Sequence, residues 1–277
     1  MKNVIILTGS EPRHSFFRKA IALSGACTVV RSYCEGLEQS LEARLDRQDA
    51  TADGLQRHHV AARAQSEADF FALFNHFAED RSHPQFLPKG AVNDEAHVGE
   101  IVSKAPDLIA AFGCSLIKQP LIGAFEGRFL NAHLGLSPYY RGSGTNFFAM
   151  VDGALEYVGA TFMFLDAGID TGDIIHQIRA RVYPGDTPHQ IGNRLIGDVA
   201  MVYGELIARF DELAPMAQPA ETEMVRLCKR DDFTEAATRH LYRQFADGAV
   251  ARYLNESEAR EAAVPIIRNP NLADIGL

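Results

Sequence analysis

Apolar runs alternate with helical spacings along the first part of the chain. Residues 3–8 form a short apolar run closed by a Gly-Ser pair, a pattern typical of a buried strand. Residues 15–25 have helical spacing and end in Gly25, which favours a helix C-terminus. Residues 27–33 predict a second strand. A strand, a helix and a strand within about thirty residues indicate a βαβ unit with a right-handed crossover.

Residues 36–104 are mostly polar, and they are helical where they are periodic. The first part of this stretch predicts a charged helix, and Ser66 is expected to be the N-cap of a second one. We expect the charged side chains here to be solvated. His58 and His59 lie among polar residues and indicate no ligand geometry.

Apolar segments in the second half predict the remaining strands. Residues 108–117 fit a central parallel strand, and residues 128–136 fit another. Residues 156–166 and 174–183 predict an antiparallel pair joined by a polar loop. A Thr-Pro pair at 187–188 is expected to begin a long helix as its N-cap and first residue. The chain is therefore expected to be an α/β protein, with a Rossmann-like, doubly wound, mostly parallel sheet and helices on both faces.

The last part of the chain differs in composition. Residues 214–220, APMAQPA, indicate a linker, and an amphipathic helix is expected beyond it, ending near Gly248. We expect a main domain over residues 1–213 and a small C-terminal appendage over residues 221–277. This appendage would be a small subdomain or a dimerisation tail, the latter making the protein a homodimer.

Composition narrows the classes of partner. The 277 residues carry a formal net charge of -9, which disfavours broad contact with nucleic-acid phosphates. The four cysteines show no zinc-ligand spacing and are expected to be reduced thiols, with Cys114 buried in a strand. The apolar run at the N-terminus is too short for a signal peptide or a membrane span. A cytoplasmic protein with neither a membrane nor a nucleic-acid partner is expected.

The loop after the first strand lacks a nucleotide fingerprint. It reads TGSEPRHSFF, without the second and third glycines that let a backbone approach a pyrophosphate. The chain also has no Walker A pattern and no G-x-S-x-G elbow. A nicotinamide-dependent oxidoreductase is therefore disfavoured.

Asn131, His133 and Asp170 are the residues that suggest chemistry. Asn131 and His133 are two residues apart near the end of a predicted strand, so they should share a face of the sheet. An amide donor beside an imidazole suits acyl transfer, since the amide can stabilise an oxyanion while the imidazole moves a proton. Asp170 lies in a loop between Gly168 and Gly172 that could bend its carboxylate toward the imidazole. Spacing alone also allows each of the three to be a hydrogen-bonded structural residue.

The segment from Asn131 to Gln177 resembles the signature of the formyltransferase family. This family includes methionyl-tRNA formyltransferase, glycinamide ribonucleotide transformylase and the sugar N-formyltransferases. Its pattern is Asn-x-His, a Leu-Pro-x-Tyr-x-Gly-like segment and Asp-x-Gly-x-Asp-x-Gly. The second and third parts resemble residues 137–142 and 166–172 of this chain.

The resemblance implies a reaction and a set of contacts. The family's catalytic Asn, His and second Asp correspond to Asn131, His133 and Asp170, its formyl donor is 10-formyltetrahydrofolate, and no metal is required. Residues 108–122 resemble the strand and turn along which the family binds the pterin. The implied cofactor contacts are Phe112, Gly113, Ser115, Leu116, Ile117, Leu165, Ala167 and Gly168. The implied contacts with the amine substrate are Tyr139, Tyr140, Arg141 and Asn146.

The resemblance leaves the acceptor of the formyl group open. Leu134 is followed by Gly-Leu-Ser, where the bacterial tRNA enzyme usually has Pro/Gly-Ser-Leu-Leu. That enzyme also normally carries a larger C-terminal domain, whereas residues 215–277 hold eight Lys and Arg against ten Asp and Glu. GLSPYYRGSGTNFF and KRDDF resemble the enzymes that formylate amino sugars, commonly nucleotide-linked, in surface-polysaccharide pathways. An amino sugar is thus the expected acceptor. The alternatives are methionyl-tRNA, hydrolysis of the formyl donor, or folate binding without catalysis.

Overall fold

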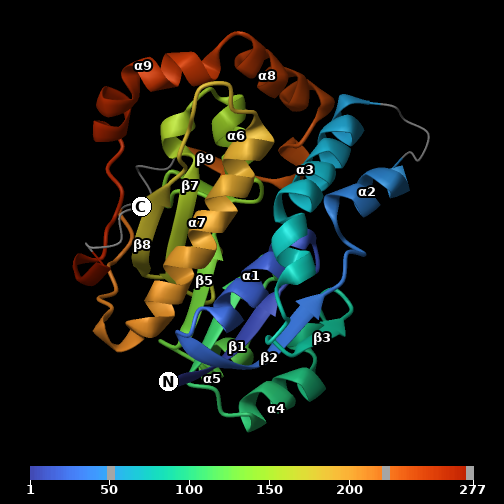
Figure 1. Cartoon of the computed structure of the whole chain (residues 1–277), viewed down its shortest axis with the longest axis vertical. Helices are drawn as coiled ribbons and strands as arrows, with labels where there is room; N and C mark the ends of the chain where they lie inside the picture. The colour runs from blue at the N-terminus through green and yellow to red at the C-terminus, as the bar shows by residue number, and fades with distance from the viewer. Residues whose placement is uncertain (49–53, 220–224, 273–277) are drawn as a thin grey trace.

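The computed structural model describes residues 1–48, 54–219 and 225–272, and its centre is a seven-stranded sheet of order β3-β2-β1-β4-β5-β7-β8 (Figure 1). The first five strands in this order are parallel, whereas β7 is antiparallel to both β5 and β8. This confirms the expected Rossmann-like, mostly parallel sheet. The strands of the sheet are β1 (Lys2–Thr8), β2 (Cys27–Glu35), β3 (Pro84–Leu87), β4 (Leu108–Phe112), β5 (Phe129–His133), β7 (Gly159–Phe164) and β8 (Ile174–Arg179).

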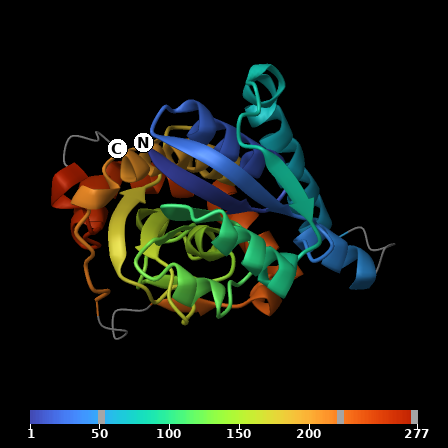
Figure 2. The same ribbon diagram turned by 90° about the horizontal axis from the view of Figure 1, so that it is seen from below.

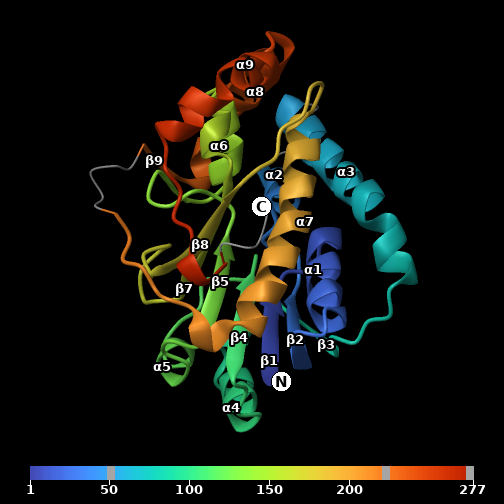
Figure 3. The ribbon, with the colours of Figure 1, turned by 60° about the vertical axis from the view of Figure 1, so that its left-hand side comes forward.

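Helices cover both faces of the sheet because the central strands are apolar on both sides. In β1, Val4 and Ile6 pack in the same cluster as Phe17 of α1, whereas Ile5 and Leu7 pack with α4 and α5 on the other face. Helices α1 and α7 lie next to each other, and α3 packs against both (Figure 3). The view from below shows α1 on one side of the N-terminal strands and α4 on the other (Figure 2). These helices are α1 (Pro12–Leu23), α2 (Leu41–Gln48), α3 (Leu55–Phe77), α4 (Glu95–Ser103), α5 (Leu121–Ala124), α6 (Thr145–Val151) and α7 (Pro188–Ala208).

The strongest local signals of the sequence are confirmed. Thr187 is the N-cap of α7, and its hydroxyl accepts from the N–H of Gln190 while the Gln190 side chain accepts from the N–H of Thr187. This reciprocal pair is a capping box, which satisfies two amide groups at the start of the helix. Gly25, with φ 76°, follows the C-cap of α1, as expected of the residue that ends a helix. The antiparallel pair β7 and β8 is also present.

Three expectations for the first half are wrong. Ser66 lies inside α3, which begins at Leu55, and its hydroxyl accepts from the amide of Asn193 instead of capping a helix. Glu67 is buried rather than solvated, because it pairs with Arg13 of α1 across the helix interface. Cys114 is a half-buried thiol outside any strand, since the left-handed Gly113 ends β4 one residue earlier.

The C-terminal part packs on the main sheet domain. In the segment expected to be a linker, Met216 pairs with Ile174 of β8 through two backbone hydrogen bonds of 2.8 Å, and residue 220 lies outside the described residues. Beyond it, β9 (Arg226–Cys228) pairs in parallel with the short strand β6 (Tyr140–Gly142). The expected amphipathic helix is α8 (Glu235–Ala246), and the unexpected α9 (Ala249–Ala262) follows it. No helix in the described ranges is both long enough and apolar enough to cross a membrane.

Tyr203 of α7 links the two central strands that lead to the cleft. Its side chain is fully buried. Its hydroxyl donates to the carbonyl of Leu130 on β5 at 2.7 Å and accepts from the N–H of Ala111 on β4 at 3.1 Å. Burial keeps the pKa of this phenol well above its usual value, so it remains a neutral donor. One hydroxyl therefore satisfies two buried backbone groups beside Asn131, which pairs with Ala111.

We predict that Tyr203→Phe lowers the free energy of unfolding by about 1–3 kcal/mol, because it leaves a buried N–H and a buried C=O without this partner. Urea unfolding measures the difference. Tyr183→Phe is the control, since Tyr183 is 47% exposed and should change stability by less than about 0.5 kcal/mol. Equal stability of the Tyr203 variant and the wild type would contradict this account.

Candidate active site

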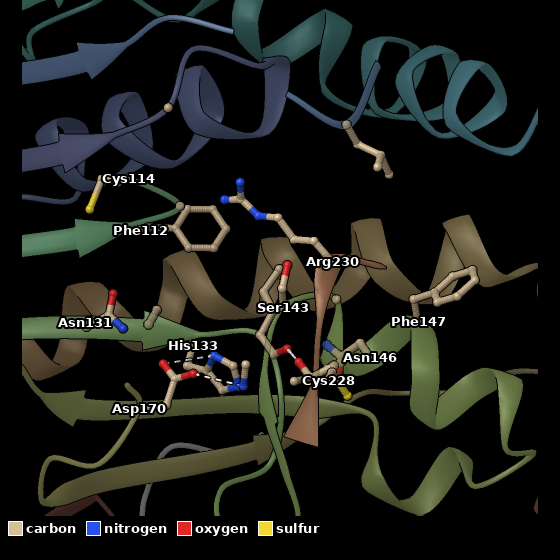
Figure 4. Close-up of a pocket in the computed structure, with 18 of the residues that line it drawn as sticks. Phe112, Cys114, Asn131, His133, Ser143, Asn146, Phe147, Asp170, Cys228 and Arg230 are labelled. Carbon is tan, nitrogen blue, oxygen red and sulfur yellow. Dashed lines mark hydrogen bonds and ion pairs between the residues drawn. The ribbon is translucent and has the colours of Figure 1, made fainter. Parts of the chain in front are cut away.

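A cleft of about 960 Å³ opens at the carboxyl ends of β1, β4 and β5. Its walls include Gly9 after β1, residues 113–117 after β4 and residues 131–134 at the end of β5. Ligands of doubly wound folds bind at such strand ends. Asn131, His133 and Asp170 all line this cleft, so the structure brings the three sequence candidates together (Figure 4).

His133, the last residue of β5, contacts the carboxylate of Asp170. Its Nδ1 lies 3.3 Å from Oδ1 of Asp170 (Figure 4), and the imidazole is 9% exposed. Nε2 of His133 has no hydrogen-bond partner within the described residues and lies against Gly135. A Cβ at position 135 would come within 2.7 Å of that nitrogen. The carboxylate thus orients the imidazole, and the glycine leaves room for the ring.

Asn131 lies on the same face of β5 as His133. Leu130 and Ala132 pack toward α1 and α7, whereas Phe129 packs in the opposite cluster, so the alternation places the odd-numbered residues together. Asn131 is half-buried, and within the described part of the chain its side-chain amide makes no hydrogen bond. The amide can therefore donate to a group bound in the cleft.

The loop over residues 165–173 carries Asp170. Oδ2 of Asp170 accepts from the backbone N–H of Gly142 at 3.2 Å. Both carboxylate oxygens of Asp166 accept from the hydroxyl of Thr171, at 2.7 and 2.9 Å, which closes the loop on itself. Asp166 therefore shapes the loop, while Asp170 presents a carboxylate to the cleft.

Most residues expected to contact the formyl donor line the cleft. Ala167, an exposed residue of the loop after β7, does not. Ile117 is buried in the core. Leu116 is 63% exposed, which leaves an apolar side chain available to a ligand. The expected residues in the lining are Phe112, Gly113, Ser115, Leu116, Ile117, Leu165 and Gly168.

Glu35, which the sequence did not single out, holds the segment after β4 in place. Its buried carboxylate accepts from the N–H groups of Ser115 at 2.5 Å and of Gly90 at 2.9 Å, and it pairs with Lys89 at 3.2 Å. A lone Glu at the end of a strand gives no sign of such distant partners.

Of the four expected substrate contacts, only Asn146 lines the cleft. Its side chain is already bound to the backbone of Gly159, donating to the carbonyl at 2.9 Å and accepting from the N–H at 3.1 Å. Tyr139, Tyr140 and Arg141 lie outside the lining. They are held elsewhere, since the Tyr139 hydroxyl donates to Pro265, the buried Tyr140 hydroxyl to Asp152, and Arg141 to the carbonyl of Ile169.

Charged residues that the sequence did not single out lie at the start of α1. The carboxylate of Glu11 is 2.7 Å from Nδ1 of His14 and 2.9 Å from Arg13. Although burial alone would raise it, the hydrogen bond with His14 and the charge of Arg13 hold the pKa of Glu11 well below its usual range. The N-terminus of α1 therefore faces a carboxylate of the protein itself, at a position where related folds often bind phosphate.

The C-terminal segment forms another wall of the cleft. Residues 227–230 and Phe233 line it, together with Phe147 of α6 and His59 of α3. Burial, helped by the nearby His189, lowers the pKa of His59 to about 3, so its imidazole is neutral at pH 7. His59 thus belongs to an aromatic wall, although the sequence suggested no role for it.

Comparisons with known proteins identify the family of the chain. Residues 47–203 match the formyl transferase family. Methionyl-tRNA formyltransferase of Thermus thermophilus is 31% identical over 174 residues, which cover 61% of this chain and 56% of that protein. The corresponding enzyme of Desulforamulus reducens is 40% identical over 83 residues, or 30% of this chain and 26% of that one. The matched part thus spans about half or less of these relatives.

Solved structures show the same fold. A sugar N-formyltransferase from Shewanella sp FDAARGOS_354 superposes with a TM-score of 0.55 at 17% identity, covering 84% of this chain and 78% of that one. Phosphoribosylglycinamide formyltransferase from Streptococcus pneumoniae TIGR4 gives a TM-score of 0.51 at 18% identity, covering 76% and 99%. The family match extends over more than half of the sequence, and the chain belongs to the formyl transferase family.

Proposed function

We propose that this protein transfers a formyl group from 10-formyltetrahydrofolate to the amine of a small molecule, most simply an amino sugar or a nucleotide-linked amino sugar. The observation that carries the proposal is the contact of His133 with Asp170 in one cleft with Asn131. Family membership supports formyl transfer as the reaction. It does not identify the acceptor, because the relatives act on different ones.

The residues of the cleft suit the proposed donor. Leu116 and Leu165 offer apolar side chains, and the segment from Gly113 offers backbone groups beside them. When bound, 10-formyltetrahydrofolate supplies the carbon that the amine attacks.

Each of the three central residues has a separate proposed role. Asn131 donates its amide N–H to the formyl oxygen as negative charge develops there, an interaction whose loss costs about 3–4 kcal/mol in comparable sites. His133 takes the proton from the attacking amine and returns it to the leaving nitrogen. Asp170 holds the imidazole in one orientation and stabilises its charged form, or positions an ordered water beside it.

The far wall of the cleft favours a small acceptor that carries an anion. Lys229 and Arg230 add two cations to this wall, and Phe147 and Phe233 add aromatic rings. Figure 4 shows Arg230 and Phe147. Cations beside aromatic rings suit a phosphate attached to a ring system. The net charge of -9 argues against the broad phosphate contacts that a tRNA needs.

We predict that His133→Asn and Asp170→Asn each lower kcat by at least about a hundredfold, since positioned acid–base groups contribute roughly 10²–10⁴. The double variant should be far less impaired than the product of the two single effects, because the pair acts as one unit. Steady-state formyl transfer measures both results. Thermal unfolding should change little, because Asp170→Asn is isosteric and His133→Asn shortens a side chain in the wall of an open cleft.

His76→Asn on the exposed side of α3 is the matched control and should keep wild-type turnover. Near-normal turnover of a folded His133 variant would contradict the assignment. A loss of stability as large as the loss of activity would instead indicate a structural role for the pair.

We predict that nucleotide-linked amino sugars accept the formyl group, whereas initiator methionyl-tRNA does not. Each candidate acceptor is incubated with the protein and 10-formyltetrahydrofolate, and mass spectrometry then detects whether the acceptor has gained a formyl group. Arg230→Ala should raise KM for the nucleotide-linked acceptor by about tenfold, as expected when a charge-assisted hydrogen bond of about 1.5 kcal/mol is lost. Arg239→Ala, on the exposed side of α8, is the control.

Efficient formylation of the tRNA that weakens steeply with salt would contradict this acceptor assignment. Consumption of the formyl donor at the same rate with no amine present would favour a hydrolase. Folate binding without turnover on any amine would favour a non-catalytic binding protein.

A further inference from the structure

Asp170 has a left-handed backbone conformation, which few non-glycine residues adopt. Its φ is 53°, in the left-handed region where a Cβ crowds the chain. Such a conformation is strained and persists only where its surroundings hold it. The loop around it has no regular secondary structure, and several of its residues are exposed. Within the loop, Asp166 holds Thr171, whereas the backbone carbonyl of Asp170 is held from another part of the chain.

One of these contacts comes from Gln218, in the segment predicted to be a linker. The Nε2 of Gln218 donates to the carbonyl of Asp170 and to the carbonyl of Gly172, both at 2.8 Å. The two carbonyls lie on either side of Thr171, so one primary amide fixes their separation. Gln218 is itself anchored, because Met216 pairs with Ile174 two residues earlier.

Two further contacts reach the loop from β6. Arg141 donates to the carbonyl of Ile169 at 2.8 Å, and the N–H of Gly142 donates to the Asp170 carboxylate at 3.2 Å. Neither of these two contacts holds the backbone carbonyl of Asp170. Gln218 is half-buried and is absent from the cleft lining, so it can act on the reaction only through the loop.

We propose that Gln218 is a positioning residue. It keeps the Asp170 carboxylate against His133 because it binds the backbone carbonyls of the left-handed turn, those of Asp170 and Gly172. This inference rests on the proposed function of the cleft. It also assigns a role to residues 214–219 beyond connecting two parts of the chain, since they hold the loop that bears the carboxylate.

Gln218→Met tests the proposal in the full-length protein, because methionine keeps the length of the side chain and removes both donors without adding charge. We expect kcat to fall between about tenfold and a hundredfold, since a small misplacement of a reacting group can cost about a hundredfold. KM for both substrates should stay within about twofold, because no binding contact is removed. Gln244→Met on α8 is the matched control and should behave as the wild type.

A double-mutant cycle separates positioning from a general structural effect. In the Asp170→Asn background, Gln218→Met should lower kcat little further, because the group that it positions is already gone. Full multiplication of the two effects, or a normal kcat for Gln218→Met alone, would overturn the proposal.

Nitrogen NMR shifts of the His133 ring, recorded without substrates, test the same claim without activity. The wild type and Gln244→Met should show one tautomer with the proton on Nδ1, whereas Gln218→Met should show a mixture, because the carboxylate no longer selects one form. An unchanged single tautomer in Gln218→Met would count against the proposal. If the wild type transfers no formyl group, the proposed function fails, while this measurement still decides the role of Gln218.

Discussion

The proposed chemistry depends on the contact between the imidazole of His133 and the carboxylate of Asp170. The topology of the sheet does not by itself bring these two residues together. Strand β7 runs antiparallel to β5, so it starts beside His133 and ends beside Leu130. The loop after β7 therefore begins near the other end of β5, where the N–H of Leu165 donates to the carbonyl of Phe129. Asp170 reaches His133 only because this loop folds back along the sheet and turns through a left-handed residue.

The C-terminal segment contributes to the same contact from outside the sheet. Gly142, whose N–H donates to the Asp170 carboxylate, lies in β6, and β6 pairs with β9. Gly142 has φ 95°, and a Cβ there would come within 2.3 Å of the carbonyl of Cys228, so no other residue fits without moving β9. The strand that supports Asp170 and the strand that forms part of the cleft wall are thus tied together, which couples the appendage to the proposed chemistry.

The sequence predicts the parts of this structure that local signals control. The buried strand β1 and the capped start of α7 follow from apolar runs and from a Thr-Pro pair. Prediction from the sequence fails where contacts between residues far apart in the chain determine the bounds of a helix or strand. Ser66 is a good capping residue, yet the helix extends past it on the N-terminal side, where Gln56 donates to the carbonyl of Phe233 and His59 contacts Tyr242 of α8. The four-residue strand β3 carries too short a pattern to be recognised.

The candidate site likewise contains residues whose positions local spacing predicts and residues whose positions depend on tertiary contacts. Asn131 and His133 are two residues apart on one strand, so their shared face follows from the period of a strand. The position of Asp170 follows only from the family resemblance, because the return of its loop depends on tertiary contacts. Glu35 and Gln218 act on backbone groups more than forty residues away, and no spacing rule indicates such pairs.

The most direct test of the central claim is a crystal structure of the protein with 5-formyltetrahydrofolate, an unreactive relative of the proposed donor. The account predicts that the pterin lies along residues 113–117, with the formyl oxygen about 3 Å from the amide nitrogen of Asn131 and the formyl carbon facing His133. A folate bound away from these residues, or a formyl group out of reach of both side chains, would contradict the account.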